Sequence, residues 1–474
     1  MTRARYFAAL TAAALIFLAW IAASADGPPL FSSHEVVAIR LTAPFNDLIR
    51  STQNDYAVTG TLSYAAGSER STIEGVRISI RGHTSRRSGE CTFPKLKLQL
   101  PPASARSTGL FAGIKTVKLG THCGEAGDEA PTSRYGRVLN ERSAHREAFV
   151  YRLLDIVGVL TLKARPARVT YVYADARPGQ AADEQRPVVR DAFFLEQDDE
   201  AVKRAGGRQQ VDEKGFTNAR DRFTASDTAA IAFAEAMIGN FDWCLKMYPG
   251  DAYRCNARHP LWNVIAVVGA NGGARPLIYD FDVSGAVSGG HRWFNEVYSD
   301  QFLPSRSHTA IEVLGQVQRT RTLFDRAVLD ATRAHFMEKK SAAYNALKSA
   351  SLDDFGRRRI QEYLDAFFTT MASDDEFYRP VVTESRTLPY LDPGRRRVAC
   401  AAQGPVPVGT VVGDPLRTSG RMIQVVLLDT LWRWGPESKC ATVHAEPVWI
   451  DGSAVSRDYP PRTRPLPTNT TRRR

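Results

Sequence analysis

The chain of 474 residues lacks the motifs that mark several large enzyme classes. It contains no Gly-x-Ser-x-Gly elbow, no Walker A loop and no Gly-x-Gly-x-x-Gly turn, which argues against a serine hydrolase, a P-loop NTPase and a dinucleotide-binding enzyme. Its nine histidines are scattered, so a histidine-centred metal site or triad is not indicated. Lys and Arg (62) exceed Asp and Glu (51) by 11, a modest excess that does not indicate nucleic-acid binding.

Long hydrophobic runs are equally scarce, because only one segment is apolar enough to cross a bilayer. Residues 6–22 are almost purely apolar, follow the basic Arg3 and Arg5, and precede the small residues Ala23-Ser24-Ala25. This order predicts a signal peptide at 1–25 and no integral membrane domain after its cleavage. An uncleaved anchor is the alternative, because the run is long for a signal. Both interpretations predict an exported bacterial protein, periplasmic or extracellular.

Cysteine is also rare, with six residues in the chain. They form no Cys-x-x-Cys motif, and none has the spacing from histidine that zinc sites use. An even count in an exported protein favours structural disulfides, although sequence alone allows 15 connectivities. Their clustering along the chain favours three local pairs: Cys91–Cys123, Cys244–Cys255 and Cys400–Cys440.

The hydrophobic pattern indicates an α+β protein in several parts. Residues 95–100 alternate charged or polar with apolar residues, as a half-buried strand does, whereas residues 135–157 and 227–239 have helical periodicity. We expect a helical stretch at 308–373 and short strands beyond about residue 390. The predicted domains are a strand-rich N-terminal lobe (26–205), a helix-rich C-terminal lobe with a metal-binding and catalytic hairpin (206–388), a small disulfide-linked β-module of SH3-like kind (389–455), and a disordered basic tail (456–474).

Acidic and amide side chains at the ends of predicted elements are the best candidates for chemistry. Asp280 and Asp282 close a predicted hairpin strand, where residues two apart on extended chain point the same way and could hold Mg²⁺. Asp242 follows a predicted helix, and Asn263 lies on the first hairpin strand. A base followed by two metal ligands is the order found in phosphotransferases. Taken singly, each of these residues could equally cap or line a turn.

The N-terminal lobe holds basic residues that could bind a nucleotide phosphate. Lys95 and Lys97 lie on a predicted strand, downstream of a glycine-containing turn that begins at Arg81. The predicted helix at 135–157 offers Glu147, or alternatively Glu141, to orient such a lysine. The alternative for these lysines is an exposed strand face.

Taken together in their order along the chain, these motifs resemble those of the CotH family of atypical secreted protein kinases. The resemblance covers about residues 75 to 290 and rests on the ordered set rather than on any single motif. Leu96 follows Lys95 where the family has a second lysine, so the choice between Lys95 and Lys97 stays open. The matching segments are Arg81-Gly82-His83-Thr84-Ser85-Arg86, Phe93-Pro94-Lys95, Arg146-Glu147-Ala148-Phe149 with Gly158, Phe194-Leu195-Glu196, Asn240-Phe241-Asp242, Asn263 and Asp280-Phe281-Asp282.

The resemblance implies a two-lobed protein-kinase-like fold, ATP and Mg²⁺ as cofactors, and transfer of the γ-phosphoryl group to a hydroxyl of a protein substrate. It implies that Asp242 orients the acceptor hydroxyl, that Asn263, Asp280 and Asp282 hold the metal, and that Glu196 lies near the adenine.

A catalytically inert envelope protein is the alternative. In that case the C-terminal β-module would bind cell-wall polymer or a protein partner.

Overall fold

The structure is a computed structural model of the chain. The predicted signal at 1–25 and residues 459–474 of the predicted tail lie outside the residues it describes. The described residues are 27–53, 55–67, 69–82, 84–87, 89–106, 108–125, 127–175, 187–209, 222–245, 261–289, 306–321, 323–399, 404–406, 408–428 and 447–458.

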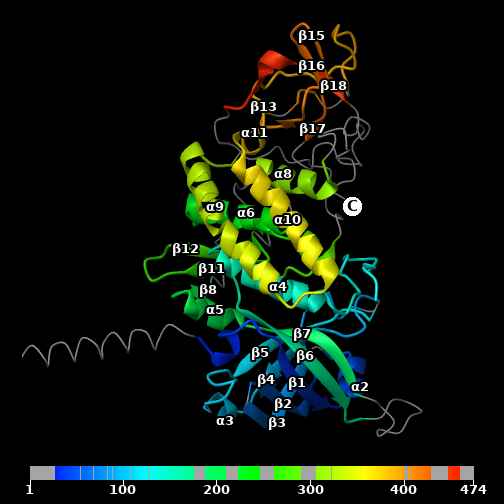
Figure 1. Ribbon diagram of the computed structural model, residues 1–474, viewed down its shortest axis with the longest axis vertical. Helices are drawn as coiled ribbons and strands as arrows, with labels where there is room; N and C mark the ends of the chain where they lie inside the picture. Colours follow the sequence, from blue (N-terminus) through cyan, green and yellow to red (C-terminus); the bar gives the residue numbers. More distant parts are fainter. Residues whose placement is uncertain are drawn as a thin grey trace, which may run out of the picture. The chain divides into compact units, whose positions relative to one another are not determined.

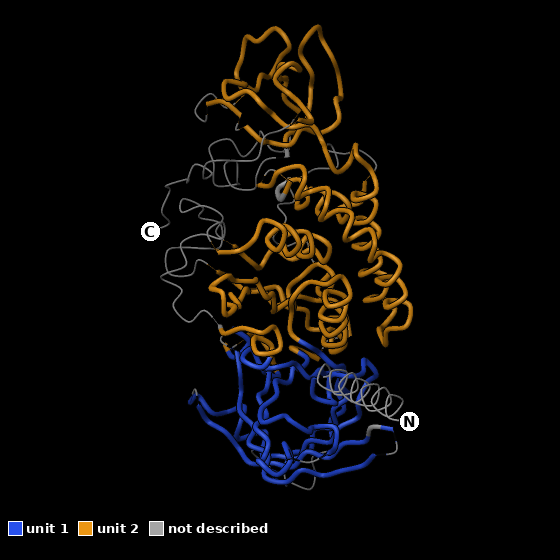
Figure 2. The backbone as a smooth tube through the Cα atoms, turned by 90° about the vertical axis from the view of Figure 1, so that its left-hand side faces the viewer, with its two compact units in different colours: residues 1–86, 93–122, 163–200 blue, residues 87–92, 123–162, 201–474 orange. Residues whose placement is uncertain are grey.

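The chain divides into two compact units, coloured separately in Figure 2. Unit 1 comprises residues 1–86, 93–122 and 163–200, and unit 2 comprises the rest. Unit 2 therefore takes three segments, 87–92, 123–162 and 201–205, from the stretch that the sequence assigned to the N-terminal lobe. The sequence-based domain boundaries and the two-lobed layout stay predictions.

Unit 1 is built around a closed barrel of seven strands in the order β1-β2-β3-β4-β5-β7-β6 (Figure 1). β1 and β6 pair in parallel, and the other neighbours pair antiparallel. Barrel closure was not predicted from the sequence, because it depends on pairing between the first strand and β6, far along the chain. The strands are β1 (Val37–Ala43), β2 (Ala57–Ala66), β3 (Glu69–Ile80), β4 (Leu96–Gln99), β5 (Thr116–Thr121), β6 (Ala164–Tyr173) and β7 (Val188–Leu195).

Alternating side chains fill the barrel. On β4, Leu96 and Leu98 are fully buried in the core, while Lys97 is exposed on the opposite face, as the alternation predicted. Gly60 lies at a bulge in β2, where an added Cβ would stand 2.4 Å from the carbonyl oxygen of Thr42. The short elements around the barrel are η1 (Pro29–Phe31), α2 (Phe45–Arg50) and α3 (Pro102–Ala105).

Unit 2 contains the main helices (Figure 1). The helical stretch predicted at 308–373 is confirmed as three helices: α10 packs against both α8 and α9, and all three contact α6. The helix predicted at 135–157 begins only at Ser143, because Gly136 has a φ of +75° and the chain before the helix forms turns. The helices are α4 (Ser143–Ile156), α5 (Asp198–Arg204, which begins in unit 1), α6 (Ala225–Met237), α7 (Gly285–Ser288), α8 (His308–Arg321), α9 (Arg326–Ser349), α10 (Asp354–Ala372) and α11 (Asp374–Phe377).

A buried hairpin follows α6 in unit 2. Its strands are β11 (Val264–Val268) and β12 (Ala274–Ile278), with β8 (Arg208–Gln209) completing a three-stranded sheet. The predicted first hairpin strand is interrupted at Asn263, which separates β11 from β10 (Leu261–Trp262). β10 pairs instead with β9 (Cys244–Leu245).

The C-terminal part of the described chain forms two small antiparallel sheets, with the orders β17-β14-β13-β19 and β15-β16-β18. Short strands beyond residue 390 are thus confirmed, whereas the SH3-like arrangement stays a prediction. The strands are β13 (Val381–Val382), β14 (Val411–Val412), β15 (Arg417–Ser419), β16 (Met422–Val425), β17 (Leu427–Leu428), β18 (Val448–Asp451) and β19 (Val455–Ser456), with η7 (Gly452–Ala454) between the last two.

One predicted disulfide is described completely: Cys91 and Cys123 are bonded, as their spacing suggested. Cys244 is also disulfide-bonded, and Cys255, its predicted partner, lies outside the described residues. Both members of the predicted Cys400–Cys440 pair lie outside them as well. Within the described part of the chain, no helix combines the length and apolarity needed to span a bilayer.

Candidate active site

Asp242 and Asn263 lie in direct contact at the start of the hairpin. The side-chain nitrogen Nδ2 of Asn263 donates to the carbonyl oxygen of Asp242 (2.6 Å) and to its Oδ2 (3.3 Å). The indole Nε1 of Trp262 donates to Oδ1 of the same carboxylate (3.2 Å). Both carboxylate oxygens of Asp242 therefore accept hydrogen bonds, which fix the orientation of this side chain. Trp262 is 39% exposed, so this contact lies at the protein surface.

Asp280 follows the second hairpin strand and lies at the same end of the hairpin. The backbone N–H of Tyr279 donates to the carbonyl oxygen of Asn263 (3.2 Å). The next N–H, that of Asp280, donates to the hydroxyl of Tyr151 on α4 (3.0 Å). The fold thus brings together three residues that the sequence selected separately, Asp242, Asn263 and Asp280.

Two of these residues have an unusual backbone conformation. Among the described residues other than glycine, only Asn263 (φ +53°), Asp280 (φ +68°) and Arg395 (φ +57°) have positive φ. The left-handed region is uncommon for residues with a Cβ, although Asn and Asp tolerate it best, and such residues concentrate at functional sites. Two of the three predicted metal ligands, Asn263 and Asp280, thus lie where the hairpin departs from regular backbone.

The expectation that Asp280 and Asp282 lie on one extended strand is wrong. β12 ends at Ile278, and the left-handed Asp280 turns the chain before Asp282. Asp282 instead accepts a hydrogen bond through Oδ2 from Nε of Arg137 (2.7 Å). Burial of Arg137 lowers its pKa, but attraction and hydrogen bonding to Asp282, together with attraction to Asp280 and the hydrogen bond to Glu90, outweigh burial and raise the pKa of the guanidinium.

Sequence reasoning missed Arg137. It lies 145 residues from Asp282 in the sequence, within a stretch assigned to a helix, and no motif marks it.

Backbone contacts hold the loop of Asp242 against the loop of Asp280. The N–H groups of Gly285 and Ala286 donate to the carbonyl oxygens of Gly239 and Ile238, both at 3.0 Å. Tyr363 of α10 leaves no room for side chains here, because a Cβ on Gly239 would stand 2.2 Å from its ring and one on Gly285 would stand 1.8 Å from its hydroxyl. Both glycines are therefore required by close packing.

A buried carboxyl group lies behind Asp242. Asn240 donates from Nδ2 to Oε2 of Glu235 (2.9 Å) and accepts through Oδ1 from the N–H of Asp242 (3.0 Å). Glu235, on α6, is fully buried. Burial raises its pKa well above the ordinary value, the hydrogen bond from Asn240 opposes this rise, and the nearby Asp242 charge adds to it. Glu235 is therefore the buried end of a chain of hydrogen bonds that reaches the backbone of Asp242.

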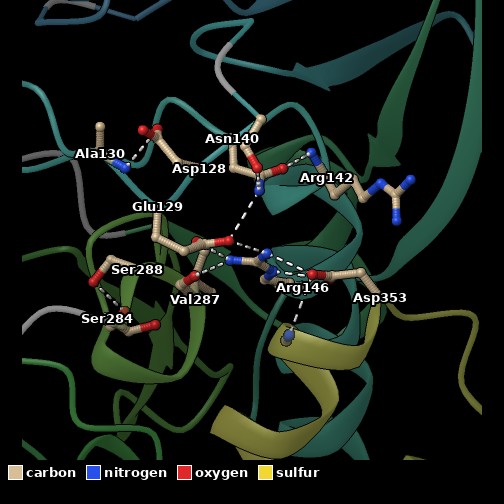
Figure 3. Close-up of polar contacts among 12 residues, drawn as sticks. Asp128, Glu129, Ala130, Asn140, Arg142, Arg146, Ser284, Val287, Ser288 and Asp353 are labelled. Atoms are coloured by element: carbon tan, nitrogen blue, oxygen red, sulfur yellow. Dashed lines mark hydrogen bonds and ion pairs between the residues drawn. The ribbon is translucent and has the colours of Figure 1, made fainter.

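Helix α4, which carries Glu147 and Tyr151, is fixed by a buried arginine (Figure 3). Arg146 has no exposed surface and lies between two carboxylates, with contacts of 2.8 Å to Oε1 of Glu129 and 2.7 Å to Oδ2 of Asp353. Burial opposes the charge of Arg146, but its hydrogen bonds to Glu129 and Asp353 raise its pKa. Because Asp353 also caps α10, accepting from the N–H of Gly356, this cluster joins α4 to α10.

The other predicted site residues are divided between the units. Arg81, Lys95, Lys97 and Glu196 belong to unit 1, whereas Glu147 is buried on α4 in unit 2. Lys95 is half-buried, and Glu196 accepts through Oε2 from the N–H of Lys163 (2.9 Å). Pairing of Glu147 with either lysine stays a prediction, as does the role of Glu196.

The side-chain oxygen atoms at this end of the hairpin are ligands of the type that Mg²⁺ prefers. A carboxylate and an amide oxygen, from Asp280 and Asn263, are hard oxygen ligands, and Mg²⁺ is commonly held by one or two carboxylates together with substrate phosphates. Among the described residues no cluster of three or more His, Cys, Asp or Glu side chains has the geometry of a metal site. When bound, the ion would neutralise charge on the phosphates.

Comparison with known proteins finds distant likeness among solved structures. No family model matches the sequence, and no curated protein matches it. Among solved structures, the chain is similar to one described as the crystal structure of a Helicobacter pylori proinflammatory kinase, CtkA. The two are 9% identical with a TM-score of 0.28, over 68% of this chain and 93% of that chain. At this score the likeness does not establish a shared fold.

Proposed function

We propose that the protein is an exported, CotH-like kinase that transfers the γ-phosphoryl group of Mg-ATP to a hydroxyl of a protein substrate. The observation that carries the proposal is the convergence of Asp242, Asn263 and Asp280 at one end of a hairpin, with the last two in left-handed backbone. Three oxygen-bearing side chains in the order of base, ligand and ligand are what phosphoryl transfer requires.

In this proposal the roles follow from the contacts. Asp242, fixed by Trp262 and Asn263, orients the acceptor hydroxyl. Asn263 and Asp280 hold Mg²⁺, and Lys95 or Lys97 binds phosphate. Because phosphoryl transfer needs little covalent chemistry from the protein, positioning and charge neutralisation supply most of the rate.

The cross-link between Cys91 and Cys123 supports the exported part of the proposal, because stable disulfides form mainly in oxidising compartments.

The test is incorporation of labelled phosphate from γ-labelled ATP into an envelope extract of bacterial cells. The parent protein should label at least one protein band in the presence of Mg²⁺, and Asp242→Asn should not. Absence of labelling by folded parent protein, under conditions where a control kinase is active, would contradict the proposal.

The second candidate, an inert envelope protein, is favoured by the charge of the C-terminal part. Residues 379–474 hold 15 Lys and Arg against 8 Asp and Glu, so this fifth of the chain carries 7 of the net 11 positive charges. Arg395, Arg396 and Arg397 are exposed on one turn. An anionic cell-wall polymer suits such a surface, because guanidinium groups bind phosphate and carboxylate in pairs of hydrogen bonds. Polymer binding without nucleotide binding would select this candidate.

A further inference from the structure

A second cluster of charged side chains adjoins the candidate active site. Arg137 donates from Nε to Oδ2 of Asp282 (2.7 Å) and from Nη1 to Oε1 of Glu90 (2.9 Å). The side chains of Arg137, Asp282 and Glu90 are 10%, 11% and 2% exposed, respectively. We call these residues, Glu90, Arg137 and Asp282, the Arg137 bridge.

The Glu90 end of the bridge is held by the disulfide. Glu90 immediately precedes Cys91, which is bonded to Cys123, and the N–H of Thr92 donates to the carbonyl oxygen of Cys123 (2.8 Å). The hydroxyl of Thr132 donates to the same Oε1 of Glu90 that accepts from the arginine (2.7 Å). Glu90 is therefore held by the disulfide next to it in the chain, and its carboxylate is held by the hydroxyl of Thr132.

The Asp282 end of the bridge lies on the turn that carries Asp280. The N–H of Ser284 donates to the carbonyl oxygen of Phe281 (3.0 Å), which closes this turn before α7. The backbone N–H of Asp280 donates to the hydroxyl of Tyr151 on α4, and the ring of Phe281 packs against the same tyrosine. The ion pair of Asp282 with Arg137 adds a side-chain contact on the far side of the turn.

We propose that the bridge positions the metal-binding turn: Glu90 orients Arg137, Arg137 holds Asp282, and this fixes the turn from which Asp280 reaches the metal. The proposal rests on the proposed role of Asp280 as a metal ligand. Asp282 is then the anchor of the turn and not a ligand, and Glu90 and Arg137 are positioning residues. A guanidinium is required because it donates to both carboxylates at once, whereas one ammonium cannot span both in the same geometry.

The first experiment compares three single variants, Glu90→Gln, Arg137→Lys and Asp282→Asn, in the full-length oxidised protein. Turnover is measured at saturating Mg-ATP, at a temperature where each variant is fully folded, and Mn²⁺ affinity is measured by titration with the metal alone. Each variant should lose about 10- to 100-fold in turnover, as residues that support a metal ligand do. Lys339→Met, which removes a half-buried cation on α9 in the same unit, should match the parent.

The double variant Glu90→Gln/Asp282→Asn decides whether the residues act as one unit. If they do, the double variant is no slower than the slower single variant, because the bridge is already broken. The proposal is overturned if Asp282→Asn alone abolishes Mn²⁺ binding while Glu90→Gln and Arg137→Lys match Lys339→Met. In that case Asp282 is itself a ligand.

The second experiment does not depend on activity. Hydrogen exchange of the backbone amides at 279–289 is measured in the metal-free protein. All three bridge variants should exchange faster there than the parent and Lys339→Met, and unchanged exchange would overturn the positioning role. If the parent binds neither Mn²⁺ nor nucleotide, the proposed function fails, while this measurement still decides whether the bridge holds the turn.

Discussion

Two aspartates at the end of one hairpin have different surroundings, and this difference separates their proposed roles. Asp242 accepts hydrogen bonds on both carboxylate oxygens, from Trp262 and Asn263, whereas the backbone N–H of Asp280 donates to Tyr151 and its φ is left-handed. The first arrangement suits a group that orients a hydroxyl, and the second suits a ligand presented from a tight turn.

Substitution by asparagine should separate these roles, because asparagine keeps the shape at both positions and tolerates the left-handed backbone at 280. Asp280→Asn should weaken Mg²⁺-dependent nucleotide binding by about 10-fold or more. Asp242→Asn should keep nucleotide binding and lower turnover by about 10²- to 10⁴-fold, the range for acid–base groups. Calorimetric titration with Mg-ATP and a turnover assay test both. Equal, full activity in the two variants would remove the kinase assignment.

Glu235 should make the stability of the protein depend on pH. Its pKa is raised in the folded state, chiefly by burial, so above its ordinary value of 4.5 the folded state retains a proton that the unfolded state loses. Stability from this group is therefore complete below about pH 4.5 and is lost as the pH rises toward the folded-state pKa, by at most about 1.4 kcal/mol per pH unit.

Glu235→Gln keeps the hydrogen bond from Asn240 and cannot titrate. The difference in unfolding free energy between this variant and the parent, measured by denaturant titration from pH 4 to pH 8, should therefore grow in favour of the variant as the pH rises. A difference that stays constant across this range would show that Glu235 is not protonated in the folded protein.

At the level of elements, α4 depends on one buried side chain for its connection to α10. Arg146 is fully buried between Glu129 and Asp353, and its guanidinium lies 4.9 Å from the ring centre of Phe355. The helix also carries Tyr151, whose hydroxyl accepts from Asp280. Displacement of α4 would therefore reach the candidate site.

Arg146→Met should lower the free energy of unfolding by about 3–5 kcal/mol, because it leaves two carboxylates without their shared cation in a buried site. Arg146→Lys should rescue little of this loss, since one ammonium cannot make the paired contacts to both acids. Chemical denaturation of the two variants is the measurement, with Lys339→Met, at a half-buried position outside the cluster, as the control. A loss for Arg146→Met no larger than that of the control would show that the cluster does not stabilise the fold.

For the whole molecule, ligand linkage separates an active kinase from an inert envelope protein. A ligand that binds only the folded state stabilises it, by about 2.7 kcal/mol at 100 times its dissociation constant. We therefore expect the melting temperature of the parent to rise with Mg-ATP and to fall back when EDTA removes the metal. The melting temperature of Asp280→Asn should change with neither addition. If the melting temperature of the parent does not respond to Mg-ATP, the inert candidate is favoured.

The sequence by itself determined the local features. Alternation on Lys95–Leu100 predicted which residues face the barrel core, the breaker-poor stretch at 308–373 predicted helices, and local spacing predicted the Cys91–Cys123 pair. These features depend on the periodicity of apolar residues and on short separations along the chain, both of which can be read from a sequence. The sequence also selected Asp242, Asn263 and Asp280 as candidates, although only the fold shows that they meet.

Tertiary structure decided what depends on contacts between distant segments. Closure of the barrel requires β1 to pair with β6, and the partner of Asp282 lies 145 residues away at Arg137. The extended strand predicted through Asp280 and Asp282 is wrong because a left-handed residue follows the end of β12, and side-chain alternation applies only while the backbone stays extended. Likewise, nothing in the sequence distinguishes Glu235 or Arg146 from other charged residues. Burial raises the pKa of the Glu235 carboxyl group, and burial between two carboxylates makes Arg146 the link between α4 and α10.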